Sequence, residues 1–307
     1  MVFLLLAILC GSLFSIVFKL GQRSGVDGLQ VILFNYSIAF LFTLLPIAAR
    51  VAFDPSVAVE DYIPHASAWL LALVQGVFFL TGFSIMDRST RESGVALTTV
   101  CARAALILPV VLSWLLLGQP APSWLAVILT VAAMVLIIGP TGKAPAGRQV
   151  ASRRSGRYLT MLGLAGVFVV FGLSDFFLKV VQHSVSANTA DASLVDRRLS
   201  ALTCIIFFFM ASAASLLACL LSGSFRRKRV GWNTVGWGAL LGIANIGCTL
   251  CMLKALAVMP TGVFYPLYNI GIVLVATLAG LLFFGERLKW VQAAGLALAV
   301  AAIAFSF

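Results

Sequence analysis

Two stretches of this chain resemble each other: SGVALTTVCARAALILPVVLSWLLLGQPAPSWLAVIL at residues 93–129 and TGVFYPLYNIGIVLVATLAGLLFFGERLKWVQAAGLAL at residues 261–298. The matched pairs are Gly94-Val95 with Gly262-Val263 and, with one residue of slippage, Gly118-Gln119 with Gly285-Glu286. Each stretch holds two apolar segments joined by a short polar turn. A further parallel joins Phe18-Lys19-Leu20 to Leu178-Lys179-Val180. The order of the matches indicates an internal duplication.

Apolar segments long enough to cross a bilayer occupy most of the 307 residues, of which 62% are hydrophobic and 10% charged. A helix needs about 20 apolar residues to span the hydrocarbon core. The sequence predicts an all-α integral membrane protein with ten spans, at residues 2–20, 28–50, 68–89, 92–117, 121–140, 158–182, 199–222, 235–258, 260–284 and 288–306. A soluble domain could not bury so much apolar surface.

The duplication divides the prediction into two five-helix repeats, 1–140 and 158–307, joined by a linker at 141–157 that is rich in Gly, Pro, Ala and Arg. Because five is odd, the second repeat enters the membrane inverted relative to the first. Inverted repeats around a central cavity are the architecture of many secondary transporters. Glycines inside the spans, Gly242 and Gly247 among them, are interpreted as close-packing positions.

The formal net charge of +11 is carried mainly in loops and at span ends. If the spans alternate, the linker and the Arg226–Arg229 run share one face with most of the other cations. The positive-inside rule then places both termini outside and the linker in the cytoplasm of a cell, most simply at the inner membrane of a bacterium. The basic run is too short to predict a nucleic-acid surface, so no nucleic-acid partner is expected.

Residue types needed for metal or enzyme chemistry are sparse. The six cysteines lie in apolar segments, and the two histidines, His65 and His183, lie outside the spans. Cys248 and Cys251 form a single CxxC with no second pair. No HExxH-like pattern or paired intramembrane aspartates are visible. We expect no enzyme activity, no cofactor and no metal site.

The ten-span layout, the repeated Gly-Glu-like ending of the fourth and ninth spans and the Pro260-x-Gly262 opening resemble the drug/metabolite transporter superfamily, specifically the EamA-type permeases. The resemblance covers nearly the whole chain. It implies a basket of ten helices whose substrate cavity opens alternately to each side. Gln119 stands where the family favours an acid, whereas Glu286 keeps it. Many members place their termini in the cytoplasm, which is the reverse of the charge prediction.

Arg103 is the most informative single residue, because it falls near the middle of the fourth span. A guanidinium there cannot easily reach either interface, and an ionisable group at that depth normally faces a cavity or a partner. Its planar fork suits a carboxylate or phosphate. Two interpretations stay open: contact with substrate, or a fixed pairing with Asp175 that only holds two helices together.

Coupling or gating roles are predicted for Asp175, Lys179 and Lys254. Asp175 is the only carboxylate clearly within a span, so it is the one plausible proton carrier if protons or sodium drive transport. Lys179 follows it by one helical turn and could instead be its permanent partner. Lys254 lies near a span end, where snorkelling to the headgroups is the alternative.

Polar side chains on four spans complete the predicted substrate-binding set. Tyr265, Tyr268 and Asn269 form one stripe of the ninth span. The further candidates are Asn35 and Tyr36 on the second span, Gln75 on the third and Asn245 on the eighth. Hydrogen bonds between packed helices are the alternative role for these residues.

The cation excess in the spans predicts a secondary transporter for a small anionic or zwitterionic metabolite, acting by alternating access as a monomer or homodimer. Two alternatives are a translocase of a lipid-linked phosphate and a broad-specificity drug or metabolite exporter. A cation exporter would need an acid in the first span, which has none. Binding of polyprenyl phosphate in preference to soluble metabolites would favour the translocase.

Overall fold

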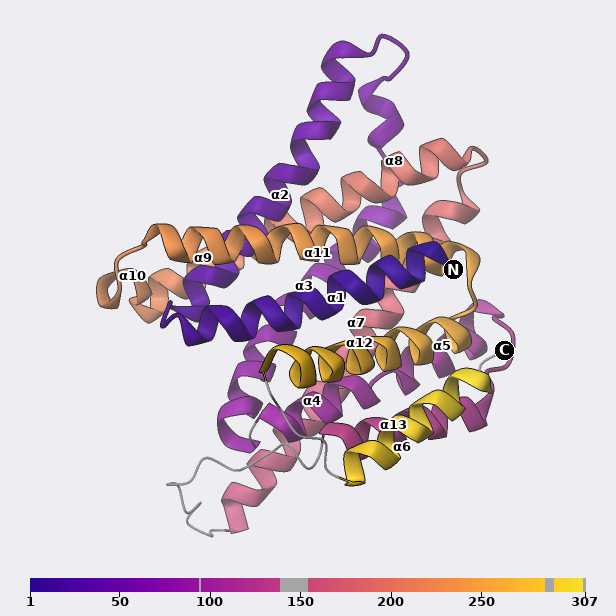
Figure 1. Ribbon diagram of the computed structural model, residues 1–307. Coiled ribbons are helices and arrows are strands. Elements are labelled where there is room, and N and C mark those ends of the chain that lie inside the picture. Colours follow the sequence, from indigo (N-terminus) through magenta and orange to yellow (C-terminus); the bar gives the residue numbers. More distant parts are fainter. Residues whose placement is uncertain (94, 139–153, 285–289, 306–307) are drawn as a thin grey trace. The chain divides into compact units, whose positions relative to one another are not determined.

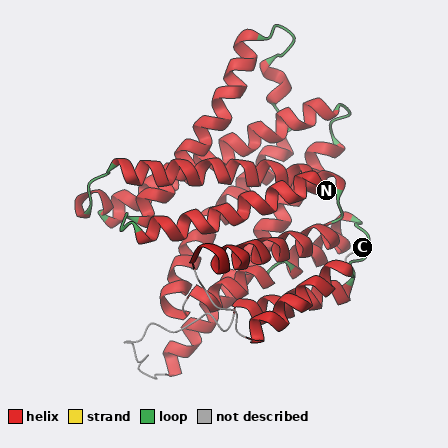
Figure 2. Ribbon diagram, viewed as in Figure 1, coloured by secondary structure: helices red, strands yellow, loops and turns green. Residues whose placement is uncertain are grey.

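The computed structural model describes residues 1–93, 95–138, 154–284 and 290–305, and these are α-helical apart from short turns and loops (Figure 2). In chain order the elements are α1 (Val2–Arg23), α2 (Gly28–Phe53), η1 (Val59–Tyr62), α3 (Ala66–Ser93), α4 (Val95–Ala104), α5 (Ile107–Leu117), α6 (Trp124–Ile138), α7 (Arg154–Ala187), α8 (Ala192–Leu202), η3 (Thr203–Phe209, a π-helix), α9 (Met210–Ser222), α10 (Ser224–Arg227), α11 (Trp232–Val258), α12 (Thr261–Phe284) and α13 (Trp290–Ala304). Most of the predicted linker and Glu286 lie outside the described residues.

Helices occur at all ten predicted spans. Five of the described helical segments are long and apolar enough to cross a membrane: 28–53, 161–187, 192–222, 232–258 and 261–279. The other predicted spans contain shorter apolar helices, at 2–13, 66–75, 101–117, 124–137 and 290–304. Large apolar side chains are exposed along many helices, as in Leu70, Leu162 and Leu282. This distribution is compatible with a membrane-embedded protein, because lipid can cover apolar surface that water cannot.

Local sequence sets several helix ends. The Asp27 carboxylate caps α2 by accepting from the Leu29 amide at 2.9 Å, and Asp191 caps α8 by accepting from the Ser193 amide at 2.8 Å. Gly118 and Gly223 end α5 and α9 with left-handed backbone at φ +63° and +66°. Such caps satisfy backbone groups that a helix end leaves without partners.

Residues 1–77 and 180–258 form one compact unit, hereafter unit 1, and residues 78–179 and 259–307 form the other, unit 2. The units do not follow the predicted division at the linker, since each draws residues from both predicted repeats. Helices of one repeat therefore pack mainly against helices of the other. Similarity between segments of one sequence predicts repeats but does not show which segments pack together.

Unit 1 is built on α11, which lies beside α1 and α2 (Figure 1). Glycines make these approaches close: a Cβ at Gly242 would lie 2.8 Å from the Asn35 carbonyl oxygen, and one at Gly247 would lie 2.8 Å from the Cys10 sulfur. The close-packing interpretation of Gly242 and Gly247 is confirmed. Small residues at helix crossings are a common packing device in membranes.

The two ends of unit 1 are tied by different side chains. At one end, Arg197 of α8 pairs with Asp61 of η1 at 2.6 Å. At the other end, the Gln30 side chain of α2 donates to the Lys228 carbonyl at 2.8 Å. Loops that follow even-numbered predicted spans meet at the first end, and loops that follow odd-numbered ones meet at the second. This grouping agrees with spans that alternate in direction.

Unit 2 contains α6 packed along α13, with α12 against α5 and α6 (Figure 1). A Cβ at Gly295 of α13 would lie 3.0 Å from the Ala133 carbonyl oxygen of α6, and Gln292 of α13 donates to the Ile137 carbonyl at 3.2 Å. On its other side, α3 meets α7 at Gly82, whose Cβ position is 3.5 Å from Val170. These helices form the frame that holds the candidate site.

Candidate functional site

The fourth predicted span is interrupted directly after Arg103, because α4 ends at Ala104 and α5 begins at Ile107. The Leu106 amide donates to the Arg103 carbonyl at 3.3 Å and the Leu108 amide to the Ala105 carbonyl at 3.0 Å. Each bond reaches the residue three positions earlier, as in a 3₁₀-helix, and not the residue four positions earlier, as in an α-helix. Pro109 explains the change, since it lacks the N–H that would reach Ala105 and its ring crowds that carbonyl.

This interruption leaves polar backbone groups inside an apolar segment. The carbonyl oxygens of Ala102 and Ala104 lose the amide donors that a continuous helix would supply, since the Leu106 and Leu108 amides point elsewhere. At membrane depth, such groups are tolerated only where protein buries them or a water-filled cavity meets them. Discontinuous helices are also where transporters bind their cargo.

Helix α7 packs directly on the interruption through a glycine. A Cβ at Gly172 would lie 2.5 Å from Leu108 Cδ1 and 2.8 Å from the Ala105 carbonyl oxygen. These distances are too short for any real side chain. Gly172 is therefore the residue that lets α7 approach the break, and the close approach also carries Asp175 of α7 toward Arg103 of α4.

Asn269 of α12 holds the Arg103 guanidinium. Its Oδ1 accepts from Arg103 Nη1 at 3.1 Å, while its Nδ2 donates to the Tyr265 carbonyl one turn earlier at 3.0 Å. The second bond fixes the orientation of the amide, so that its oxygen faces the arginine. Asn269 is buried and Arg103 is partly exposed.

Tyr265 links the same cluster to α7. Its hydroxyl donates to the Asp175 backbone carbonyl at 2.5 Å, and the side chain is fully buried. Phe264 stacks on Tyr268 with ring centroids 5.4 Å apart. The predicted stripe of the ninth span therefore does face other helices, and Arg103, Asn269, Tyr265 and Asp175 form one group, hereafter the Arg103 cluster.

The Asp175 carboxylate interacts electrostatically with Arg103 but forms no ion pair with it at 4.0 Å or less. The fixed pairing considered from the sequence is thus not made in this structure. Lys179, one turn further along α7, is buried with 4% of its surface exposed. Both predicted coupling residues of α7 lie in unit 2.

A second polar group lies in unit 1. The Asn245 side chain of α11 donates to Asn35 Oδ1 of α2 at 3.5 Å and hydrogen-bonds the Tyr36 hydroxyl. Asn35 and Tyr36 are buried beside the Gly242 crossing. Gln75 of α3 is buried as well. The sequence candidates therefore form separate groups within the two units.

Lys254 lies at the end of unit 1 where η1 and α8 meet. Its Nζ contacts Asp196 at 2.9 Å, with both side chains about half exposed, and lies 5.4 Å from the centre of the Phe3 ring. An exposed pair of this kind contributes about 0–1 kcal/mol. The pairing fits the span-end interpretation of Lys254, and the predicted coupling or gating role stays a prediction.

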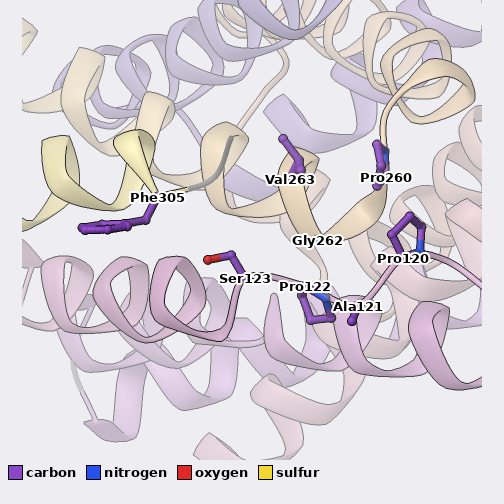
Figure 3. A pocket seen from close by; sticks show the side chains of 8 residues that line it. All are labelled: Pro120, Ala121, Pro122, Ser123, Pro260, Gly262, Val263 and Phe305. Carbon is purple, nitrogen blue, oxygen red and sulfur yellow. The ribbon is translucent and has the colours of Figure 1, made fainter.

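A cavity of ≈ 280 Å³ opens at one end of unit 2 (Figure 3). It is lined by residues of the α5–α6 loop, the beginning of α12 and the segment after α13: Pro120, Ala121, Pro122, Ser123, Pro260, Gly262, Val263 and Phe305. Figure 3 shows the Pro120–Ser123 loop facing Pro260 and Val263. None of these side chains is charged, and Arg103 is not among them. Three parts of the chain predicted on one membrane face thus meet here.

In the described part of the chain, no three His, Cys, Asp or Glu residues group closely enough to hold a metal ion. His65 instead hydrogen-bonds Ser184 through Nε2 at 3.1 Å.

Three features that build the Arg103 cluster were not predicted from the sequence. They are the break after Ala104, the close approach of α7 at Gly172 and the hydrogen bond from Arg103 to Asn269. Pro109 was a usable signal, because a proline in an apolar segment removes the bond to the residue four positions earlier. Gly172 and Asn269 gave no such signal, since their partners lie on other helices. The π-helix at Thr203–Phe209 was also missed.

No family model matches this chain. A protein of Haemophilus influenzae, described as uncharacterized, is 28% identical over 308 residues, and the match covers 98% of this chain and 95% of that protein. A crystal structure whose description states no function matches 99% of this chain and 95% of its own, with a TM-score of 0.69 and 14% identity. The whole helical fold is therefore one that also occurs in an experimentally determined structure.

Proposed function

We propose that this protein is a secondary transporter that moves a small anionic or zwitterionic metabolite across a membrane by alternating access. The observation that carries the proposal is Arg103, a permanently charged fork beside a helix break and held by Asn269 from another helix. A charged side chain inside an apolar segment is costly, by about 2.5–3.5 kcal/mol on insertion scales, and persists where it has a function.

The cargo class follows from the chemistry of the Arg103 cluster. Guanidinium presents paired donors in one plane, which suit a carboxylate or phosphate, whereas a lysine ammonium would act as a point charge. Asn269 orients the Arg103 guanidinium and is itself bonded to the Tyr265 carbonyl, and the Tyr265 hydroxyl bonds the Asp175 carbonyl. We propose that Asp175 and Lys179 couple transport to an ion, a proton or sodium, because both lie on α7 next to this cluster.

The inverted ten-span arrangement belongs to the proposal and is supported by the helix pairs. α2 packs on α9, α5 on α12 and α6 on α13. In the predicted numbering these are spans two and seven, four and nine, and five and ten, so three of the five predicted counterpart pairs are in contact, whereas span one packs on span eight. Contacts between counterparts are expected near the two-fold axis that relates inverted repeats. This pattern supports membership of the EamA-type permeases within the drug/metabolite transporter superfamily.

Orientation is proposed from the charges of unit 1. The end that holds Arg226–Arg229 is basic, whereas the end that holds Asp54, Asp61 and Asp196 is rich in acids. The positive-inside rule assigns the basic end to the cytoplasm, and we propose the bacterial inner membrane as the location.

Ligand-induced thermal stabilisation of the purified protein tests the cargo class. A cargo present at 100 times its dissociation constant stabilises the folded state by about 2.7 kcal/mol. We expect hits among carboxylates, phosphates and zwitterions, which Arg103→Gln abolishes and Lys254→Gln leaves intact. Uptake of the hit into proteoliposomes then tests transport. Hits confined to organic cations, or equal stabilisation of the Arg103→Gln variant, would refute the proposal.

A further inference from the structure

The basic run Arg226–Arg229, which begins within α10 and continues past its end, is not used by the proposed transport site. Sequence positions 19–29 and 223–231, which meet at one end of unit 1, carry six cations (Lys19, Arg23, Arg226, Arg227, Lys228 and Arg229) against one acid, Asp27. Asp27 is engaged in capping α2. The charge of this end is therefore almost unopposed.

The backbone of the run is anchored rather than loose. Gln30 of α2, which is fully buried, donates to the Lys228 carbonyl at 2.8 Å and to the Ser224 carbonyl at 3.4 Å. The Lys228 ammonium in turn donates to the Gly25 carbonyl of the α1–α2 loop. These bonds hold the chain while the Arg226 and Arg229 side chains stay exposed, with no hydrogen bond or ion pair to any other described residue.

A shallow, widely open hollow of ≈ 310 Å³, hereafter the groove, begins three residues after Arg229 along one face of α11. Its lining residues are Trp232, Asn233, Gly236, Trp237 and Leu240. Trp232 is 89% exposed, and the Cβ position of Gly236 has no atom within 4 Å. The opposite face of α11 carries Gly238 and packs closely on Phe34 of α2, so the groove faces away from the unit's core.

We propose that this surface is a binding site for one anionic phospholipid. Arg226 and Arg229 hold the phosphate-bearing headgroup, Trp232 lies at the interface, and an acyl chain lies in the groove over Gly236. Charge complementarity identifies the occupant: a polybasic segment next to a membrane helix attracts acidic lipids. Tryptophan prefers the headgroup level, and the apolar floor toward Leu240 suits hydrocarbon.

Titration of the purified protein in uncharged detergent tests the site, with phosphatidylglycerol as ligand and phosphatidylcholine as control. Retained lipid is measured by native mass spectrometry and stabilisation by thermal unfolding. One interfacial arginine contributes on the order of a fivefold change in affinity, so Arg229→Gln should weaken phosphatidylglycerol binding about fivefold and the double variant Arg226→Gln/Arg229→Gln about 25-fold. The matched control is Arg50→Gln, an exposed arginine at the other end of α2, which should bind as wild type.

The groove is tested separately by Gly236→Leu. Open space at this position and the better helix propensity of leucine mean that the lipid-free protein should unfold at or above the wild-type temperature, while phosphatidylglycerol binding falls. Added salt should weaken wild-type binding, since exposed charges are screened. Equal binding of both lipids, equal loss in Arg229→Gln and Arg50→Gln, or displacement of the lipid by soluble glycerol phosphate would overturn the proposal.

Discussion

Replacing Gly172 by alanine tests whether the close contact between α7 and the helix break positions Arg103. The new Cβ would lie 2.5 Å from Leu108 Cδ1, 2.7 Å from Leu108 Cβ and 2.8 Å from the Ala105 carbonyl oxygen. A flexible side-chain tip could move away, but a backbone carbonyl and a Cβ cannot move without their helix. We therefore expect α7 to be displaced from the α4–α5 break.

The magnitude follows from comparison with Gly166 on the same helix, whose Cβ position is 3.4 Å from Ile85 Cγ2. Both replacements gain about 1 kcal/mol of helix propensity. Only Gly172→Ala adds overpacking, which costs about 1–3 kcal/mol. The difference between the two variants should be that cost, and at about 2–4 °C per kcal/mol the Gly172→Ala protein should unfold on the order of 2–12 °C below Gly166→Ala.

Thermal unfolding in detergent measures this difference, and proteoliposome uptake measures the effect on Arg103. Gly172→Ala should lose most transport, whereas Gly166→Ala should keep it. Leu108→Ala in the Gly172→Ala background should restore stability only in part, because the Ala105 carbonyl contact remains. Equal unfolding temperatures and equal uptake for the two glycine variants would refute the reasoning.

Three further predictions concern the Arg103 cluster and the outer loops. Asn269→Asp places a carboxylate next to Arg103 and should reduce transport of an anionic cargo at least tenfold, which corresponds to about 1.4 kcal/mol. Pro109→Ala supplies the missing N–H to Ala105 and removes the ring that crowds this carbonyl, so it should raise stability while lowering transport. Backbone and side-chain hydrogen bonds from Ser193 hold the pKa of Asp191 below its ordinary value of 3.8, so the stability this carboxylate adds is present at neutral pH and is lost as the pH falls below 3.8.

Each of these has a measurement that contradicts it. Wild-type uptake by Asn269→Asp would show that Arg103 does not meet the anionic cargo. A less stable Pro109→Ala protein, or one with full uptake, would show that the break is not needed. For Asp191, unfolding temperatures between pH 3 and pH 7 should fall more steeply at the acid end in wild type than in Asp191→Asn. Parallel curves would contradict the cap.

Periodicity and composition predicted the helices well, because every predicted span from 2–20 to 288–306 contains a helix. Arg103 stood out for a simple reason, since a cation in the middle of an apolar segment is rare. Asn269 was predicted from the polar stripe of its own helix. Membership in one cluster was not predicted, because a single sequence does not show which faces of distant helices meet.

Other features of the structure were not predicted, for physical reasons. A continuous fourth span at 92–117 was predicted from hydropathy, which is insensitive to hydrogen bonding, and Pro109 interrupts it. The ion pair of Lys254 with Asp196 was not predicted, because Asp196 reaches Lys254 from another helix, α8. Each compact unit draws helices from both predicted repeats, and neither hydropathy nor sequence similarity shows which helices pack together.

The dependence of uptake on cargo charge, compared between wild type and Arg103→Gln, tests the central claim most directly. A transported carboxylate or phosphate and its uncharged amide or ester analogue are each assayed in both proteins. We predict that Arg103→Gln reduces uptake of the charged cargo tenfold or more and leaves uptake of the uncharged analogue unchanged. Removing the cargo's charge and removing the arginine should therefore have non-additive effects on uptake. Equal effects of the replacement on both compounds would contradict a guanidinium that binds the anionic group.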